Sequence, residues 1–252
     1  MNAPSPAAPL RASFLRLFTV QASWNYDRLL GVGMGVAEEP LLRGLKRDGT
    51  DGAAYRAAVA RGARFFNAHP YLCGLAVGAT ARAEYDGAPP DEVERLRTAL
   101  CGPLGALGDR LVWAGWLPLL STAAVAAVAL GARWWAAAVF LLVYNAGHVA
   151  LRWWALHAGW AAGTGVASAL RHPVLQRPLA LVGPAMAFVA GVCLPLAARW
   201  LVRPFPLAVA AGSAVVAAVA VVLLRWLPGR VRSLWLGMGA VALGLVGGWL
   251  WR

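Results

Sequence analysis

Asn67 and His69 are the residues best suited to bind a polar ligand, because they lie at a proline-containing break between two apolar stretches. Pro70 lacks a backbone N–H and disfavours helix in the residue before it, so a helix is expected to end at about Ala68. A helix that ends inside an apolar region exposes backbone groups, and Asn and His add side-chain hydrogen bonds suited to hydroxyls. The alternative is a helix C-cap with a hydrogen-bonded histidine, and the local pattern does not separate the two.

Asp109 is the last acidic residue of the chain, and it follows a glycine-rich stretch. The stretch contains Gly102, Pro103, Gly105 and Gly108. Glycine and proline destabilise a helix, so we expect non-helical backbone here, of the kind that membranes tolerate only beside protein or a water-filled cavity. The carboxylate of Asp109 is expected to accept hydrogen bonds from a ligand, to pair with Arg110 or to cap the helix that follows.

A third polar group lies within a strongly apolar run. Asn145, His148 and Arg152 follow one another at spacings of three and four residues, so they share one face of a helix. Ionisable side chains within a membrane helix tend to face a cavity or the interior of a bundle. The face is therefore either part of a transport pathway or a polar patch through which two helices pair.

The charge pattern indicates which elements hold these residues. All eleven acidic residues lie at or before Asp109, whereas the 143 positions after it carry eleven Arg and no Asp, Glu or Lys. Five of the uncharged runs between these arginines are taken as spans, each about as long as the roughly 17 to 25 residues that span a bilayer. The runs cover residues 111–132, 134–151, 178–198, 204–224 and 233–251. The sequence therefore predicts an all-α membrane protein with about five transmembrane helices.

The residues before the first span are expected to form an amphipathic and re-entrant helical region. The apolar periodicity over 12–37 predicts one amphipathic helix at the membrane surface, and a second helix is expected over 53–66. The apolar segment 72–81 is too short to cross a bilayer and fits a re-entrant or interfacial segment. Pro90 is positioned to begin the next helix. The predicted divisions are a disordered tail over 1–10, the helical region over 11–109 and a transmembrane bundle over 110–252.

Composition excludes several other classes of protein. The net charge of +12 comes almost entirely from arginines beside the predicted spans, so it indicates lipid headgroups and not nucleic acid. Cys73, Cys101 and Cys193 are widely spaced among apolar neighbours, so we expect neither a disulfide nor a metal site. The sequence contains no nucleotide-binding, nucleophile-elbow, zinc or haem motif, and we predict no cofactor and no catalytic residue.

The arginines also predict an orientation in the membrane. The N-terminal segment lacks the pattern of a secretory signal, so the N-terminus is expected to stay in the cytoplasm. Five spans then place the densest arginine clusters on the cytoplasmic side and the C-terminus outside. These clusters are Arg225, Arg230 and Arg232, followed by Arg171 and Arg177.

Four segments carry short motifs in a family-like order. Residues 21–28, QASWNYDR, include Trp24 and Asn25 and match Q-x-S-W-N-[YF]-[ED]-R. Residues 65–71, FFNAHPY, approach F-F-N-T-x-P-[YF], and residues 102–109, GPLGALGD, approach G-P-L-A-G-[IV]-G-D with a Trp nearby. Residues 144–159 run from an aromatic-Asn pair into Arg-aromatic-aromatic and Gly. Together these segments resemble the IID membrane component of the mannose/fructose/sorbose class of phosphotransferase sugar transporters.

The resemblance implies a function that local patterns do not supply. In such systems IID pairs with a IIC membrane subunit, and the two form a trimer of heterodimers in the bacterial inner membrane. A hexose crosses through them while cytoplasmic IIB, charged by IIA, phosphorylates it. IID itself carries no phosphohistidine, so the resemblance makes His69 a binding or packing residue.

The same resemblance assigns roles to individual residues. Asn67 and His69 are expected to bind sugar hydroxyls, and Asp109 to anchor the cavity that the 102–108 stretch shapes. Trp24 and Asn25 are expected to organise the N-terminal region against IIC.

The chain departs from the family pattern within these motifs. Ala68 stands where threonine is usual, and Arg110 follows the aspartate where a small residue or proline is usual. These departures leave open a regulatory or scaffold subunit that docks IIB with little sugar flux. An unrelated secondary transporter that uses the helix face around His148 is a further alternative.

Overall fold

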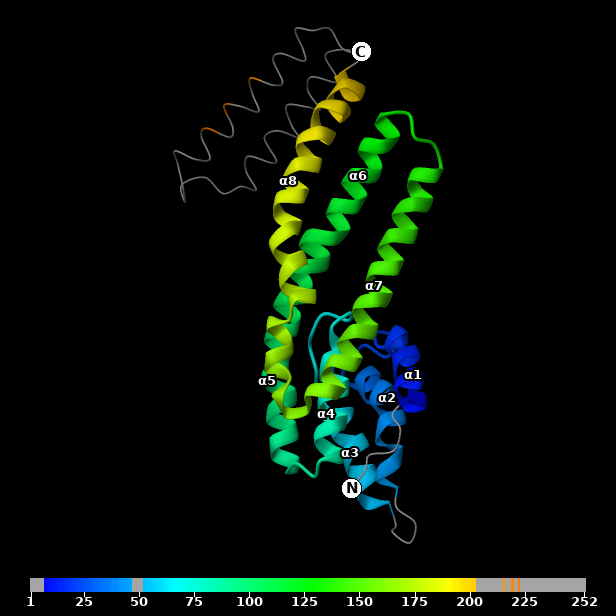
Figure 1. The fold of residues 1–252 in the computed structure, drawn as a ribbon, viewed down its shortest axis with the longest axis vertical. Helices are drawn as coiled ribbons and strands as arrows, with labels where there is room; N and C mark the ends of the chain where they lie inside the picture. Colours follow the sequence, from blue (N-terminus) through cyan, green and yellow to red (C-terminus); the bar gives the residue numbers. More distant parts are fainter. Residues whose placement is uncertain (1–6, 47–51, 203–214, 216–218, 220–221, 223–252) are drawn as a thin grey trace. The chain divides into compact units, whose positions relative to one another are not determined.

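The computed structural model describes residues 7–46, 52–202, 215, 219 and 222 of a chain that divides into two compact units, 1–194 and 195–252 (Figure 1). Every regular element in these ranges is helical. The α-helices are α1 (Ala7–Arg16), α2 (Gly31–Leu42), α3 (Ala53–Gly62), α4 (Cys73–Tyr85), α5 (Pro90–Gly108), α6 (Leu117–Ala129), α7 (Trp135–Ala162) and α8 (Pro173–Val202). A π-helix (Asp109–Trp116) joins α5 to α6, and 3₁₀ turns occupy Leu17–Thr19, Arg43–Leu45 and Gly163–Arg171.

α4 lies at the centre of the first unit, where it packs along α7 (Figure 1). Most of its residues are buried. The two helices approach closely because glycines face the backbone of the opposite helix. A Cβ on Gly74 would lie 2.9 Å from the backbone nitrogen of Leu156, and Cβ atoms on Gly78 or Gly159 would overlap backbone atoms of the other helix. With 13 residues α4 is too short to span a bilayer, as the sequence predicts for this segment.

The stretch 102–108 is helical, so the prediction of non-helical backbone there is wrong. α5 continues without interruption through the π-helix into α6. A proline within a helix removes one backbone hydrogen bond, and glycines lower the stability of a helix. The close packing of Gly108 against His69 offsets part of this cost. The backbone departs from α-helical geometry over the π-helix, Asp109–Trp116, which begins after this stretch. Because no helix starts there, Asp109 does not cap one.

Residues 12–37 form parts of α1 and α2 with a loop between them, and not the single helix that the periodicity predicts. The loop is held by the Asn25 side chain, whose Oδ1 accepts hydrogen bonds from the backbone N–H groups of Asp27 and Arg28, 3.1 and 2.9 Å away. Such a side chain competes with the helical backbone for its donors. Leu29 then adopts a left-handed conformation with φ of 48°, which turns the chain toward α2.

α3 ends at Gly62, before the predicted end of that helix at Phe66. The backbone of Phe66 instead pairs with the loop that precedes α2. Its N–H donates to the carbonyl of Arg28 at 3.2 Å, and its carbonyl accepts from the N–H of Leu30 at 3.0 Å. These long-range hydrogen bonds replace helical ones, so Pro70 does not terminate α3 as expected.

Two helical stretches within the described residues are long and apolar enough to cross a membrane, Pro90–Ala129 and Trp135–Leu194. The first three predicted spans lie largely on α6, α7 and α8. The fourth and fifth, 204–224 and 233–251, lie outside the described residues apart from isolated positions, so the number of spans stays a prediction. The all-α class is confirmed.

The predicted divisions of the chain stay an interpretation. α1 begins at Ala7, so residues 7–10 are helical and do not belong to a disordered tail. The boundary between residues 109 and 110 falls inside one continuous helix.

Candidate functional site

His69 lies in the irregular segment between α3 and α4 with its side chain buried. Its Nδ1 accepts a hydrogen bond from the backbone N–H of Tyr71 at 3.2 Å, so the neutral ring carries its proton on Nε2. Burial and, to a lesser extent, the positive charge of Arg152 lower the pKa of His69 to about 4. The imidazole is neutral near pH 7, and its Nε2–H has no partner among the described residues. This neutral donor suits a hydroxyl better than an anion.

Gly108 brings α5 against the His69 ring. A Cβ at position 108 would overlap the first carbons of the His69 side chain, so the approach requires glycine. A Cβ at Gly102 would meet nothing within 4 Å, and one at Gly105 would make a single ordinary contact at 3.9 Å. Pro103 is exposed. Of the stretch predicted to shape a cavity, Gly108 is the residue that the structure places at His69.

Tyr71 lies at the centre of an aromatic cluster that joins three elements. Its ring centroid is 4.9 Å from that of His69 and 6.1 Å from that of Trp113 on the π-helix. It stacks on His148 of α7 at 4.9 Å with an interplanar angle of 25°. Its hydroxyl lies 2.9 Å from the hydroxyl of Tyr144, also on α7. The segment between α3 and α4 is thereby fixed against both membrane stretches.

Arg152 of α7 is buried and reaches across to the N-terminal part of the chain. Its Nη1 donates to the carbonyl of Leu17, and the carbonyl of Pro70 lies 3.4 Å from the same atom. The guanidinium also lies over the rings of Phe18 and Tyr71, at 5.1 and 4.6 Å from their centroids. Carbonyl oxygens and aromatic faces thus stabilise this charge, and they hold the segment that carries His69.

Asn145 and His148 form a hydrogen-bonded pair on α7, as their helical spacing predicts. The Nε2–H of His148 donates to Oδ1 of Asn145 at 3.0 Å, and the Asn145 amide donates to the carbonyl of Leu141 at 2.6 Å. The Asn145 amide is therefore already engaged within its own helix. His148 connects this pair to Tyr71, so the polar face of α7 and the His69 segment make one cluster.

Asn67 is two residues before His69, and Asp109 directly follows Gly108, which packs against the His69 ring. Both side chains are exposed, and neither makes a side-chain hydrogen bond or ion pair with any residue that the structure describes. The expected pairing of Asp109 with Arg110 is therefore not observed. Of the three residues assigned to a sugar, His69 is the one whose side chain packs in the aromatic cluster, and the joint site stays a prediction.

Trp24 and Asn25 lie on the loop between α1 and α2. The Asn25 amide holds the loop through the two backbone donors described above, and Trp24 packs edge to face on Tyr26 at 4.8 Å between centroids. Tyr26 is 88% exposed and Trp24 half-exposed. The loop therefore presents an aromatic pair on a rigid turn.

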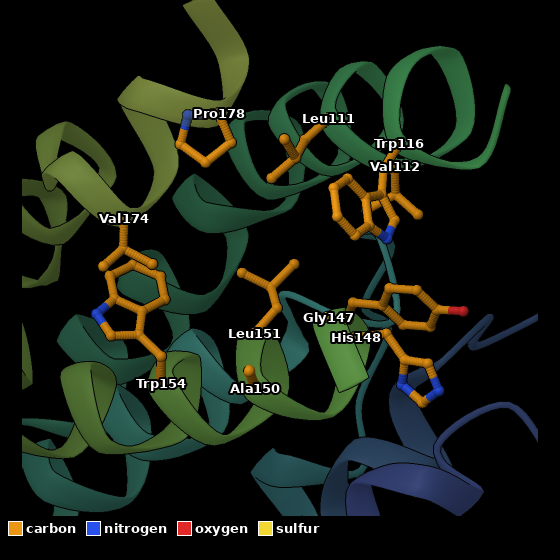
Figure 2. Close-up of a pocket in the computed structure, with 11 residues that line it drawn as sticks. Leu111, Val112, Trp116, Gly147, His148, Ala150, Leu151, Trp154, Val174 and Pro178 are labelled. Carbon is orange, nitrogen blue, oxygen red and sulfur yellow. The ribbon is translucent and has the colours of Figure 1, made fainter. Parts of the chain in front are cut away.

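A cavity of about 330 Å³ adjoins the cluster between the π-helix, α7 and α8 (Figure 2). Its walls are almost entirely apolar, and the polar groups come from Tyr71, His148 and the indole rings of Trp116 and Trp154. The lining residues are Tyr71, Leu111, Val112, Trp116, Gly147, His148, Ala150, Leu151, Trp154, Val174 and Pro178. In the described ranges no three His, Cys, Asp or Glu side chains are grouped as a metal ion would require.

Tyr71, Trp113 and Tyr144 are site residues that we did not predict. Each lies within four positions of a residue that we did select, and each is aromatic within a motif of the resemblance. Tyrosine and tryptophan beside a membrane also mark the lipid interface, so residue type alone does not distinguish the two roles.

Comparisons with known proteins agree on one family. The model of the family described as PTS system mannose/fructose/sorbose family IID component matches residues 7–250. The chain is 29% identical to the sorbose-specific EIID component of Klebsiella pneumoniae, covering 94% of each chain. It is 25% identical to the mannose-specific EIID component of Escherichia coli, covering 94% of this chain and 91% of that one.

Two solved structures share the fold. One, described as a membrane protein, has a TM-score of 0.71 at 20% identity and 95% coverage of both chains. The other, from a cryo-EM structure of the mannose transporter ManYZ, has a TM-score of 0.56 at 23% identity with the same coverage.

Proposed function

We propose that this chain, which belongs to the family of mannose/fructose/sorbose phosphotransferase IID components, forms with a IIC subunit the path along which a hexose is bound and translocated. The chain is a membrane protein of a sugar phosphotransferase system. Its relatives are named for sorbose and mannose, and a hexose is the substrate class that we infer for it.

The observation that carries the proposal is the unpartnered Nε2–H of neutral His69 within a cluster of aromatic rings. A buried donor without a partner costs about 1 to 3 kcal/mol, and a ligand hydroxyl would recover that cost. The rings of Tyr71 and Trp113 contact the His69 ring, with centroids 4.9 and 5.1 Å away, and Arg152 fixes the backbone that carries it. Rigid donors beside aromatic faces suit a ring with hydroxyls on its edge and C–H groups on its face.

The exposed polar residues support a site completed by a second subunit. Asn67 is two positions from His69, and its uncommitted amide offers both a donor and an acceptor. Asp109 is exposed at the start of the π-helix. We infer that IIC covers these side chains and that the Trp24–Tyr26 pair contributes to the same interface.

The assembly would be a trimer of IIC–IID heterodimers in the bacterial inner membrane, with the N-terminus of this chain in the cytoplasm. Cytoplasmic IIA and IIB would supply the phosphoryl group, and this chain would bind and position the sugar. A scaffold subunit that docks IIB with little flux would share the family and the fold. It would lack the affinity for sugar.

The test is to co-express the chain with IIC and to measure hexose binding to the purified complex and phosphoenolpyruvate-dependent uptake in cells. We expect binding of at least one hexose, and we expect Asn67→Ala to weaken it by about 1 to 2 kcal/mol, or roughly 5- to 30-fold. The control is Thr98→Ala, since Thr98 is exposed on α5 and donates only to its own helix. A complex that assembles yet binds no hexose would favour the scaffold function, and normal affinity in Asn67→Ala would remove that residue from the site.

A further inference from the structure

The cavity beside the aromatic cluster has a chemistry different from that of the sugar site. Helices from both membrane stretches form it: Leu111 and Trp116 face Ala150 and Leu151, while Val174 and Pro178 of α8 close another side (Figure 2). Small residues on α7, Gly147 and Ala150, leave the space open. Its volume lies at the lower end of the range typical of ligand-binding pockets, about 300 to 1,000 Å³.

The walls exclude a hexose and ordered water as occupants. A hexose buried here would lose hydrogen bonds from most of its hydroxyls, because the lining brings few polar groups: those of Tyr71 and His148 and the indole N–H groups of Trp116 and Trp154. A buried water needs two to four polar partners, and apolar cavities that lack them stay dry or bind apolar molecules. An alkyl chain fits these walls, and the bilayer around the spans supplies such chains.

The charges near the cavity indicate which lipid would donate the chain. Arg171 and Arg177 lie immediately before and within the first turns of α8, next to the wall residues Val174 and Pro178. Both arginines are exposed. The chain has no acidic residue after Asp109, so no carboxylate nearby in the sequence competes with a lipid headgroup for these arginines. Basic residues at the membrane edge attract anionic headgroups with about 1 kcal/mol each.

We propose that the cavity between the π-helix, α7 and α8 binds one acyl chain of an anionic phospholipid, whose phosphate contacts Arg177 and Arg171. The site is separate from the hexose donors at His69 but shares a wall with them through Tyr71 and His148. A bound acyl chain would pack behind the Tyr71 ring and restrain the aromatic cluster.

The experiment measures phospholipid retained by the purified complex with IIC, by native mass spectrometry after reconstitution in phosphatidylglycerol or phosphatidylcholine nanodiscs. The cavity-filling variant is Ala150→Trp, and its matched control is Val149→Trp, a neighbouring exposed position outside the cavity. Val174→Phe fills the same space from α8, where the side chain is 40% exposed and a larger one is expected to fit. Arg177→Gln tests the headgroup, with Arg133→Gln in the α6–α7 turn as its control.

We expect the unmodified complex and the Val149→Trp control to retain phosphatidylglycerol, and the two cavity-filling variants to lose it. Arg177→Gln should reduce the preference for phosphatidylglycerol over phosphatidylcholine about fivefold. Equal retention by the control and by whichever cavity-filling variant assembles with IIC would overturn the proposal. So would an unmodified complex that retains no phospholipid. Hexose binding by the same samples is scored separately, so a failure of the sugar function is recognised independently.

Discussion

Glu38 of α2 and Arg97 of α5 form an ion pair in the interior of the protein, with Oε2 and Nη1 3.8 Å apart. Only 2% of Glu38 and 3% of Arg97 is exposed. The other carboxylate oxygen of Glu38 accepts a hydrogen bond from Thr80 of α4 at 2.6 Å, so the pair connects three helices. Oε2 of Glu38 and two nitrogens of Arg97 lack hydrogen bonds within the described residues. The ion pair therefore offsets only part of the free energy that burying the two charges costs.

The first prediction is that Glu38 makes stability fall as the pH rises. Burial raises the pKa of Glu38 from 4.5 to about 7, and the opposing effects of Arg97 and the Thr80 hydrogen bond are smaller. Glu84 raises this pKa further and Arg61 lowers it slightly. The folded state binds the proton more tightly than the unfolded state, so the stabilisation is complete below pH 4.5 and is lost as the pH rises through 7.

Between pH 5 and pH 8, the free energy of unfolding of the unmodified protein should therefore fall by up to about 3 kcal/mol more than that of Glu38→Gln. Thermal unfolding of the purified complex at both values measures this difference. Glu39→Gln is the control, because hydrogen bonds, chiefly from Arg43, lower the pKa of Glu39 to about 2. Glu39 stays ionised in both states over this range, so its effect should not vary with pH. A pH slope unchanged by Glu38→Gln would contradict the prediction.

The second prediction separates two glycines of the same helix. Gly108→Ala should destabilise the protein by about 1 to 3 kcal/mol and weaken hexose binding, because its Cβ would displace the His69 ring. Gly102→Ala adds the same methyl group where nothing lies within 4 Å. It should stabilise α5 by up to about 1 kcal/mol through helix propensity. Equal effects of the two substitutions on Tm would show that Gly108 serves only backbone flexibility.

The third prediction concerns the hydroxyl pair of Tyr71 and Tyr144. Each single change to phenylalanine keeps the ring and removes one partner of the 2.9 Å hydrogen bond, so each should cost about 1 kcal/mol of stability. The double variant should cost much less than the sum of the two single changes, because the interaction is already lost in either one. Additive losses in a double-mutant cycle would mean that the two hydroxyls act independently.

The sequence predicts the class of this protein better than it predicts the site. The apolar runs and flanking arginines identify membrane helices because burial in lipid requires long uncharged segments, and Pro90 marks a helix start through its missing N–H. The break at Asn25 was missed because one side chain captures two backbone donors there, which periodicity does not register. The sequence does not predict the helix through 102–108, because glycine and proline have low helix propensity. Packing of Gly108 against His69 helps to stabilise this helix in the folded protein.

The same distinction applies to the polar residues. Spacing on one helix placed Asn145 beside His148 correctly, since residues three apart are neighbours on a helix. Proximity in sequence to His69 did not place Asn67 in the cluster, because the irregular segment points the two side chains into different surroundings. The role of Tyr71 depends on residues of the π-helix and α7, far away in sequence, so no local pattern identifies it.

The fourth prediction is that Arg152 positions the His69 segment through its shape as well as its charge. The guanidinium donates to the carbonyl of Leu17 while it lies over Tyr71 and near the carbonyl of Pro70. An ammonium group keeps the charge but lacks the planar fork, so Arg152→Lys should destabilise the complex by about 2 to 3 kcal/mol. Arg133→Lys in the exposed α6–α7 turn is the matched control and should leave the free energy of unfolding within about 0.5 kcal/mol of the unmodified value. Hexose affinity should fall in Arg152→Lys at temperatures where the complex remains folded, since a displaced Pro70 carries the neighbouring His69 donor with it. Unchanged affinity together with a lower Tm would assign Arg152 to stability alone.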